Sequence, residues 1–157
     1  MQKITTCLWF DNNAEEAVTF YTSIFKNSKV LEVSRYGEAG PGPEGSVVTM
    51  RFQLDGVELM ALNGGPAAFK FSEAISLSVD CKSQEEVDEL WEKLTEGGSE
   101  DQCAWLKDKF GLSWQIVPRA LPELLGDPDP EKSKRVMEAM LKMKKIDIKA
   151  LQEAYVG

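Results

Sequence analysis

The sequence predicts an α+β fold that consists of two βαβββ modules and a C-terminal helical appendix. Two observations carry most of this prediction: a strand–helix–strands pattern occurs twice, and the apolar stripe of each helix lies at the same offsets from its cap. A third observation, a helical pattern that follows the prolines at positions 118 and 122, predicts the appendix. We expect a single domain over residues 1–157, with module one at 1–66, module two at 72–118 and a helical tail at 119–157.

Module one begins with a strand predicted at residues 4–10, which are rich in β-branched and aromatic side chains. Asn13 and Glu16 have the spacing of a capping box, so they predict the start of a helix. That helix presents apolar residues 4, 7, 8 and 11 positions after Asn13. Asp55 and Gly56 predict a hairpin turn. Three further strands are expected at residues 29–36, 47–54 and 57–63.

Module two repeats this pattern. Alternation predicts a strand in which Ile75 and Leu77 face the core. Ser83 and Glu86 form a second capping box, and apolar residues follow at the same four offsets from Ser83. Short strands are expected around residues 102–106 and 112–117. Each module then has one helix on one face of a small sheet, and we expect the opposite face to be concave and open to a ligand.

The tail is predicted to be helical at about residues 131–144 and 147–155, with Asp147 as the cap of the second helix. Met137, Met140 and Met143 are interpreted as helix packing, although they can also form a dimer contact. Four lysines gather near the junction of the two helices, but acidic residues flank them. A solvated helix face is therefore the favoured interpretation of the lysines.

Composition excludes several function classes. The chain contains no histidine, which excludes histidine-dependent nucleophile systems and histidine-ligated metal sites. The net charge of −8 argues against a nucleic-acid partner. No apolar signal or membrane-length run follows the first residues, so we expect neither secretion nor a membrane association. Three unpaired cysteines favour the reducing cytoplasm, and Cys7 and Cys103 are interpreted as buried, inert thiols.

Several segments together resemble one protein family. They are Leu8-Trp9-Phe10-Asp11, residues 61–66, Ala74-Ile75-Ser76-Leu77, Trp105-Leu106-Lys107-Asp108, residues 110–115 and residues 139–145. With the doubled βαβββ plan, they are similar to the vicinal-oxygen-chelate superfamily, which includes glyoxalase I, bleomycin-resistance proteins and extradiol dioxygenases. The resemblance extends over nearly the whole chain and is closest to the PhnB-like branch, often labelled 3-demethylubiquinone-9 3-methyltransferase-like. It implies a curved mixed sheet or half-barrel and a homodimer.

The resemblance also implies where metal ligands would lie. The four superfamily positions fall near Thr6, near Leu59 or Glu58, near Ala74 or Glu73, and at Gln115. One neutral amide and one hydroxyl do not hold a transition metal, so we predict neither a metal nor another cofactor.

The methyltransferase label has little support in the residues. Residues 40–45 fit the spacing Gly-x-Gly-x-x-Gly, but a strand follows them, and two prolines remove donor N–H groups. We interpret this segment as a turn, and true methyl transfer is not expected.

Strand alternation predicts the ligand-facing wall. Arg51 and Gln53 alternate with apolar residues, as do Ser76 and Gln115 with their own neighbours. The alternative for Arg51 is an ion pair with Glu58 across the hairpin. Three tryptophans, Trp9, Trp91 and Trp114, are interpreted as core. The predicted wall consists of Thr6, Arg51, Gln53, Asn63, Ser76, Trp105 and Gln115.

Three functions remain compatible with these residues. The first is binding of a small polar or aromatic molecule without a transition metal. The second is an enzyme of the lyase, isomerase or dioxygenase-like kind that uses Glu58, Glu73 or Gln115 with a hard cation such as Mg²⁺. The third is a protein-interaction module that uses the acidic surface and the tail. The sequence favours the first.

Overall fold

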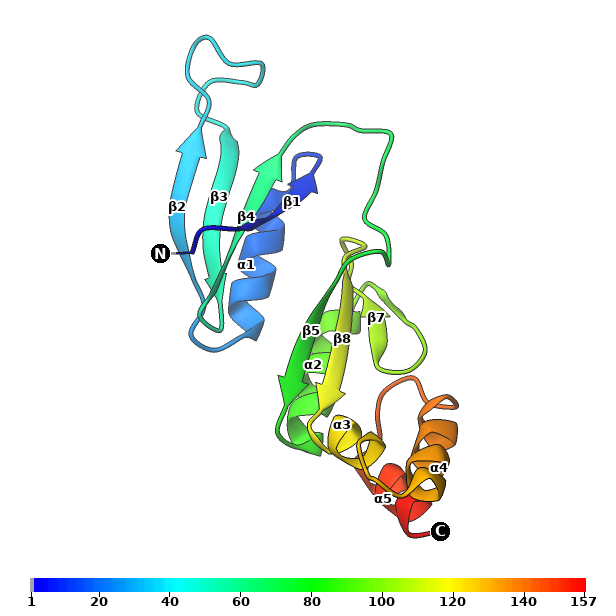
Figure 1. Cartoon of the computed structure of the whole chain (residues 1–157). Helices are drawn as coiled ribbons and strands as arrows, with labels where there is room; N and C mark the ends of the chain where they lie inside the picture. The colour runs from blue at the N-terminus through cyan, green and yellow to red at the C-terminus, as the bar shows by residue number, and fades with distance from the viewer. Residues whose placement is uncertain (1) are drawn as a thin grey trace. The chain divides into compact units, whose positions relative to one another are not determined.

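The computed structural model describes residues 2–157, and the chain divides into two compact units, Met1–Phe69 and Lys70–Gly157. Figure 1 labels the helices of both units and all strands except the short β6. The first unit contains the first βαβββ module, and the second contains the other module together with the tail.

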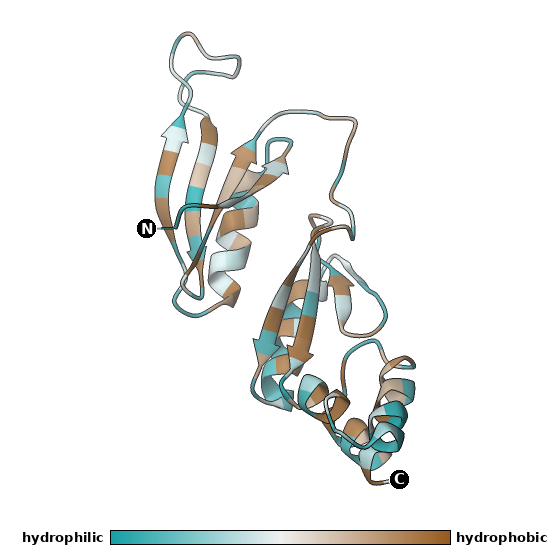
Figure 2. Cartoon of the chain, in the orientation of Figure 1, coloured by the Kyte–Doolittle hydropathy of each residue, from teal (hydrophilic) through white to brown (hydrophobic). Residues whose placement is uncertain are grey.

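The first unit has one four-stranded sheet in the order β1-β4-β3-β2. β1 runs parallel to β4, and the other neighbouring strands are antiparallel. Residues of high and low hydropathy follow one another along β3 (Figure 2), and this strand buries one face, whereas all residues of β2 are exposed. The elements are β1 (Thr6–Phe10), α1 (Ala14–Ile24), β2 (Lys29–Arg35), β3 (Val47–Leu54) and β4 (Val57–Asn63).

The core of this unit lies between the sheet and α1. Phe52 and Ala61 are fully buried on the helix side of the sheet. Tyr21 of α1 is equally buried and stacks on Phe52, with the two ring centroids 6.5 Å apart. The alternate positions of β3, among them Thr49 and Arg51, are partly exposed on the other side. The predicted alternation of β3 is therefore confirmed.

The two predicted capping boxes have different outcomes. At α2, the Ser83 hydroxyl accepts a hydrogen bond from the backbone N–H of Glu86 at 3.2 Å, which confirms that cap. At α1, Asn13 is the N-cap residue and the helix begins at Ala14, as predicted, but the Asn13 side chain makes no capping hydrogen bond, so the capping box was predicted wrongly. The side-chain oxygen of Asn63, at the end of β4, accepts the N–H of Ala14 instead. A long-range partner thus replaces the local cap.

The second unit has a four-stranded sheet in the order β5-β8-β7-β6 and four helices. β5 runs parallel to β8, and the remaining pairs are antiparallel. β6 was not predicted, because it has only two residues. The elements are β5 (Ser76–Cys81), α2 (Gln84–Thr95), β6 (Ser99–Glu100), β7 (Trp105–Lys107), β8 (Ser113–Pro118), α3 (Ala120–Leu125), α4 (Pro130–Met140) and α5 (Ile148–Val156).

One predicted core residue of this module is exposed. Ile75 precedes the first residue of β5, and 53% of its surface is accessible. Strand alternation does not apply there, because the residue lies before the ladder begins.

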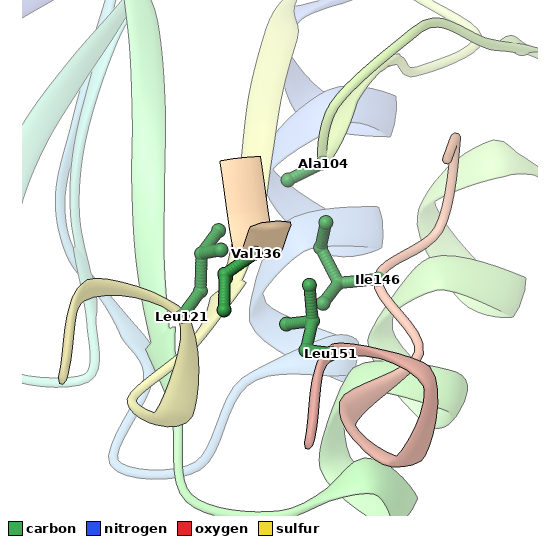
Figure 3. Close-up of a cluster of buried hydrophobic side chains, with 5 residues drawn as sticks. All are labelled: Ala104, Leu121, Val136, Ile146 and Leu151. Carbon is green, nitrogen blue, oxygen red and sulfur yellow. The ribbon is translucent and has the colours of Figure 1, made fainter. Parts of the chain in front are cut away.

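The tail packs into the second unit through its own apolar cluster. Leu121 of α3, Val136 of α4 and Leu151 of α5 converge with Ile146 and Ala104 (Figure 3). Backbone N–H groups of Cys103 and Ala104 also donate to carbonyl oxygens of Met143 and Lys144, at 2.8 and 2.9 Å.

These bonds explain why α4 ends at Met140 and not near residue 144, as predicted. The carbonyl groups of residues 143 and 144 are hydrogen-bonded to the turn before β7.

Within residues 2–157, we find no helix that combines the length and the apolar character needed to cross a membrane.

Candidate functional site

The helix-free face of the second sheet presents polar and aromatic side chains from three neighbouring strands. Gln115 of β8 lies opposite Ser78 of β5 on one side and Trp105 of β7 on the other. Leu77, Trp114 and Leu106 are the alternate residues of the same strands, and the last two are buried on the helix side. Side chains directly opposite on neighbouring strands lie side by side on one face.

A hydrogen bond joins two predicted wall residues on this face. The Gln115 amide nitrogen donates to the Ser76 hydroxyl at 3.0 Å. Gln115 and Trp105 are both partly buried, and Trp105 is the register partner of Gln115. The structure therefore brings together Ser76, Gln115 and Trp105, as alternation predicts for adjacent strands.

Ser113 lies in the neighbouring row of the same face. It is fully buried, and its hydroxyl has no hydrogen-bond partner among the residues that the structure describes. Its register partners are Ser76 on β5 and Lys107 on β7. A buried hydroxyl without a partner costs free energy, so an unpaired group at this position is a candidate contact for a ligand.

Lys107 forms an ion pair with Glu73, a residue of the irregular segment before β5. The hydrogen bond from Lys107 holds the pKa of the Glu73 carboxyl below its usual value, and the same bond raises the pKa of Lys107. The sequence prediction omitted Lys107 from the wall. The sequence contains the signal that could have found it, because residues two positions apart in a strand, such as Trp105 and Lys107, face the same side.

The polar groups on the helix-free face of the first sheet are already paired. The guanidinium of Arg51 donates to Glu58 at 2.7 Å and to Glu32 at 2.6 Å. The hydrogen bonds that Arg51 donates to Glu58 and Glu32 raise the pKa of Arg51, and the bond to Glu58 lowers the pKa of that carboxyl. Gln53 donates to the backbone and side-chain oxygens of Asn27. Of the two alternatives for Arg51, the structure shows the ion pair.

Two other wall residues lie on the helix side of the first sheet. Asn63 has the register of the buried residues Leu59 and Ala61, and its amide binds Ala14 and the carbonyl of Val47. Thr6 is exposed but shares the strand parity of Leu8 and Phe10, which are buried toward α1. Neither residue lies on the helix-free face, because odd and even positions of a strand face opposite sides.

Trp9 was predicted to be core, and this was wrong: it is 39% exposed, on the face opposite Leu8. Its indole N–H donates to the carbonyl of Gly65 at 3.0 Å, and its ring meets Phe69 edge-on at 5.2 Å. Cys7, also predicted to be buried, is exposed on the same face. Only residues with the parity of Leu8 reach the helix.

The described donor set does not fit a transition metal. No group of three or more cysteine or carboxylate side chains within residues 2–157 is arranged to hold a metal ion. Glu58 and Glu73 each bind a cationic side chain, and Gln115 binds Ser76. A hard cation would have to displace Arg51 or Lys107 from its carboxylate.

The glycine-rich segment between β2 and β3 forms a turn around an aromatic ring. A β-carbon on Gly40 or Gly42 would approach the ring of Tyr36 to 2.5 or 2.6 Å, so a larger residue at either position would have to displace the ring. The N–H of Gly45 donates to the carbonyl of Tyr36 at 2.8 Å. The glycines therefore make room for Tyr36, in agreement with the predicted turn.

Two βαβββ modules in one chain are the plan of the glyoxalase-type, vicinal-oxygen-chelate fold, and comparison with known structures agrees on this fold. FosX, a fosfomycin resistance protein from Mesorhizobium loti, is 12% identical and matches with a TM-score of 0.57, over 81% of this chain and 100% of its own. Protein PA1353 from Pseudomonas aeruginosa is 23% identical, with a TM-score of 0.62, over 75% of this chain and 98% of its own. At these identities the likeness shows the fold alone.

Sequence comparison assigns the chain to a particular family within this fold. The sequence model described as 3-demethylubiquinone-9 3-methyltransferase matches residues 2–117, and the chain belongs to this PhnB-like family. A Bacillus cereus protein described as a 3-demethylubiquinone-9 3-methyltransferase, PhnB protein, is 41% identical, with a TM-score of 0.69, over 74% of this chain and 99% of its own. No protein with a curated description matches. The family match ends at residue 117, before the tail.

Proposed function

We propose that this protein binds a small polar or aromatic molecule, without a transition metal, on the helix-free face of the second sheet. The observation that carries this proposal is the group formed by Ser76, Gln115 and Trp105 beside the buried hydroxyl of Ser113, which has no hydrogen-bond partner within residues 2–157. This group offers hydrogen-bonding side chains next to an indole ring, which is the usual composition of a small-molecule site.

The ion pairs on both sheets disfavour the enzyme alternative. A carboxylate-bound Mg²⁺ or Mn²⁺ would need Glu58 or Glu73, and both carboxylates are bonded to cations. Methyl transfer is also disfavoured, because the glycine-rich segment packs against Tyr36 and does not open a helix.

We further propose that the protein is a cytoplasmic homodimer. The three cysteines are free thiols, as is usual in a reducing compartment. β1 and β5 each lie at the end of their sheet, so the outer edge of each strand is available for pairing with another strand. The fold resemblance supports the same assembly.

Native mass spectrometry of protein purified without an affinity metal or chelator tests the binding proposal. We expect a non-covalent small-molecule adduct on a dimer, and elemental mass spectrometry should detect no stoichiometric Mn, Zn, Fe or Ni. A stoichiometric transition metal would contradict the metal-free proposal, and a strict monomer at micromolar concentration would contradict the dimer.

A further inference from the structure

We propose that the ligand is a planar oxyanion, and that its anionic group takes the place of Glu73 on Lys107. This inference rests on the proposed function and names the chemical class that the second sheet would select. The Glu73 carboxylate bonds to the Lys107 ammonium group, and Lys107 belongs to the same face as Ser113 and Trp105. Glu73 thus acts as an internal substitute for the ligand's oxyanion.

The pair between Glu73 and Lys107 is of a kind that a ligand can displace. Glu73 lies in the segment between β4 and β5, before the first residue of β5 that pairs with β8. Its backbone is therefore not held by hydrogen bonds of the sheet. Its side chain is 57% exposed, whereas the Lys107 side chain is 35% exposed. An exposed pair of this kind contributes little stability, because water competes for both charges. The lysine lies deeper, on a strand, and would remain in position when the glutamate leaves.

Arg51, the cation on the first sheet, is not paired in a way that a ligand can easily displace. Arg51 is bonded to two carboxylates at once, and the pair with Glu58 uses both Nε and Nη2. Planar two-point pairs of this geometry are stronger than contacts with a single ammonium. An incoming anion would have to displace two strand residues, so we assign the oxyanion to Lys107.

Ser113 and Trp105, which neighbour Lys107, would also favour a planar oxyanion. The buried hydroxyl of Ser113 lies directly opposite Lys107 and has no partner within the described chain, so it can donate a hydrogen bond to the second oxygen of the anion. Trp105 lies two residues before Lys107 on the same strand and the same face. Its indole ring suits a flat, conjugated body next to the anionic group.

Titration of the ¹⁵N-labelled full chain with benzoate, phenylphosphonate and benzamide tests this inference. We expect benzoate or phenylphosphonate to shift the amide signals of Lys107, Ser113 and Gln115 saturably. The neutral benzamide should bind at least about tenfold more weakly, because it lacks the charge that Lys107 recognises. The two acids distinguish a carboxylate from a phosphonate.

Three variants give the decisive comparison. Glu73→Gln should tighten benzoate binding by about threefold to tenfold, because the competing carboxylate is removed. Lys107→Met should weaken it at least about tenfold, and Lys107→Arg should restore most of the affinity. The matched control Glu32→Gln removes one carboxylate from Arg51 on the first sheet and should leave the affinity unchanged.

Two results would overturn the inference. One is equal binding of benzoate and benzamide, and the other is an unchanged or lower benzoate affinity in Glu73→Gln with the fold intact by its amide spectrum. A neutral molecule found as the native ligand, with shifts at Ser76 and Gln115, would reject the oxyanion class but leave the proposed binding function standing. Shifts confined to the face of Arg51 would reject the assigned position.

Discussion

The side-chain oxygen of Asn63, the last residue of β4, accepts a hydrogen bond from the backbone N–H of Ala14, the first residue of α1, at 2.9 Å. The amide nitrogen of Asn63 also donates to the carbonyl of Val47 at 3.2 Å. One side chain therefore ties the start of the helix to the ends of two strands. It performs the capping function that the local sequence assigns to Asn13.

Asn63→Ala should lower the free energy of unfolding by about 1–2 kcal/mol, because the substitution leaves the Ala14 N–H without its cap. Urea denaturation followed by circular dichroism measures the difference. Asn13→Ala is the matched control and should change stability by less than about 0.5 kcal/mol, since the Asn13 side chain makes no capping bond. A larger effect at Asn13 than at Asn63 would contradict this assignment.

Burial raises the pKa of the Cys81 thiol to about 12, with a further contribution from the Glu86 carboxylate. The unfolded thiol ionises near its ordinary value of 9.0, so the unfolded state loses its proton first. The stabilising contribution is therefore complete below pH 9 and is lost as the pH rises toward 12.

Cys81→Ala should accordingly lose less stability than the natural protein between pH 9 and pH 11, a range set by these two pKa values. Urea midpoints at several pH values measure the difference in slope. Cys7→Ala, at an exposed thiol, is the control and should keep a slope closer to that of the natural protein. Parallel pH profiles for the natural protein and Cys81→Ala would refute the expectation.

The C-terminal helix is held by a hydrogen bond from the Tyr155 hydroxyl to Asp127 at 2.6 Å. This bond lowers the pKa of Asp127 from 3.8 and raises the pKa of Tyr155 from 10.0. Its contribution is therefore present between these values, lost as the pH falls through the pKa of folded Asp127, and lost again as the pH rises above 10.0.

Tyr155→Phe should lower the melting temperature at pH 7, and the difference from the natural protein should shrink in acid. Differential scanning calorimetry from pH 8 to below 3.8, the ordinary pKa of the Asp127 carboxyl, measures this. Tyr36→Phe, in the glycine-rich turn, controls for the loss of a phenol hydroxyl. A difference that stays constant with pH would show that the Asp127 bond does not stabilise the tail.

Leu151 is fully buried in the apolar cluster that packs the tail against the second module. Leu151→Ala should destabilise this unit by about 2–4 kcal/mol, because it removes apolar contacts and leaves a cavity. Lys149→Ala, an exposed position on the same helix, should change stability by less than about 0.5 kcal/mol. Equal effects in urea denaturation would mean that the tail does not contribute to the core.

Much of the fold was predictable because its signals are local. The alternation of β3 and the capping box at Ser83 each occupy a few consecutive residues, and both are present in the structure. Ile75 and Trp9 were predicted incorrectly for the opposite reason. Their exposure depends on where the ladder begins and on which strand face meets α1, and neither is visible in a short window of sequence.

The sequence by itself determined the two βαβββ modules, the helical tail and the family, because periodic apolar residues and short segments carry that information. Only the tertiary structure decided which polar side chains form hydrogen bonds or ion pairs with one another. Arg51 meets Glu32 across 19 positions, and Gln115 meets Ser76 across 39. Such pairings depend on strand order and register, and these follow from packing the whole chain rather than from any local pattern. Tertiary structure therefore paired Arg51, left the hydroxyl of Ser113 without a partner among residues 2–157, and placed Lys107 opposite it on the neighbouring strand.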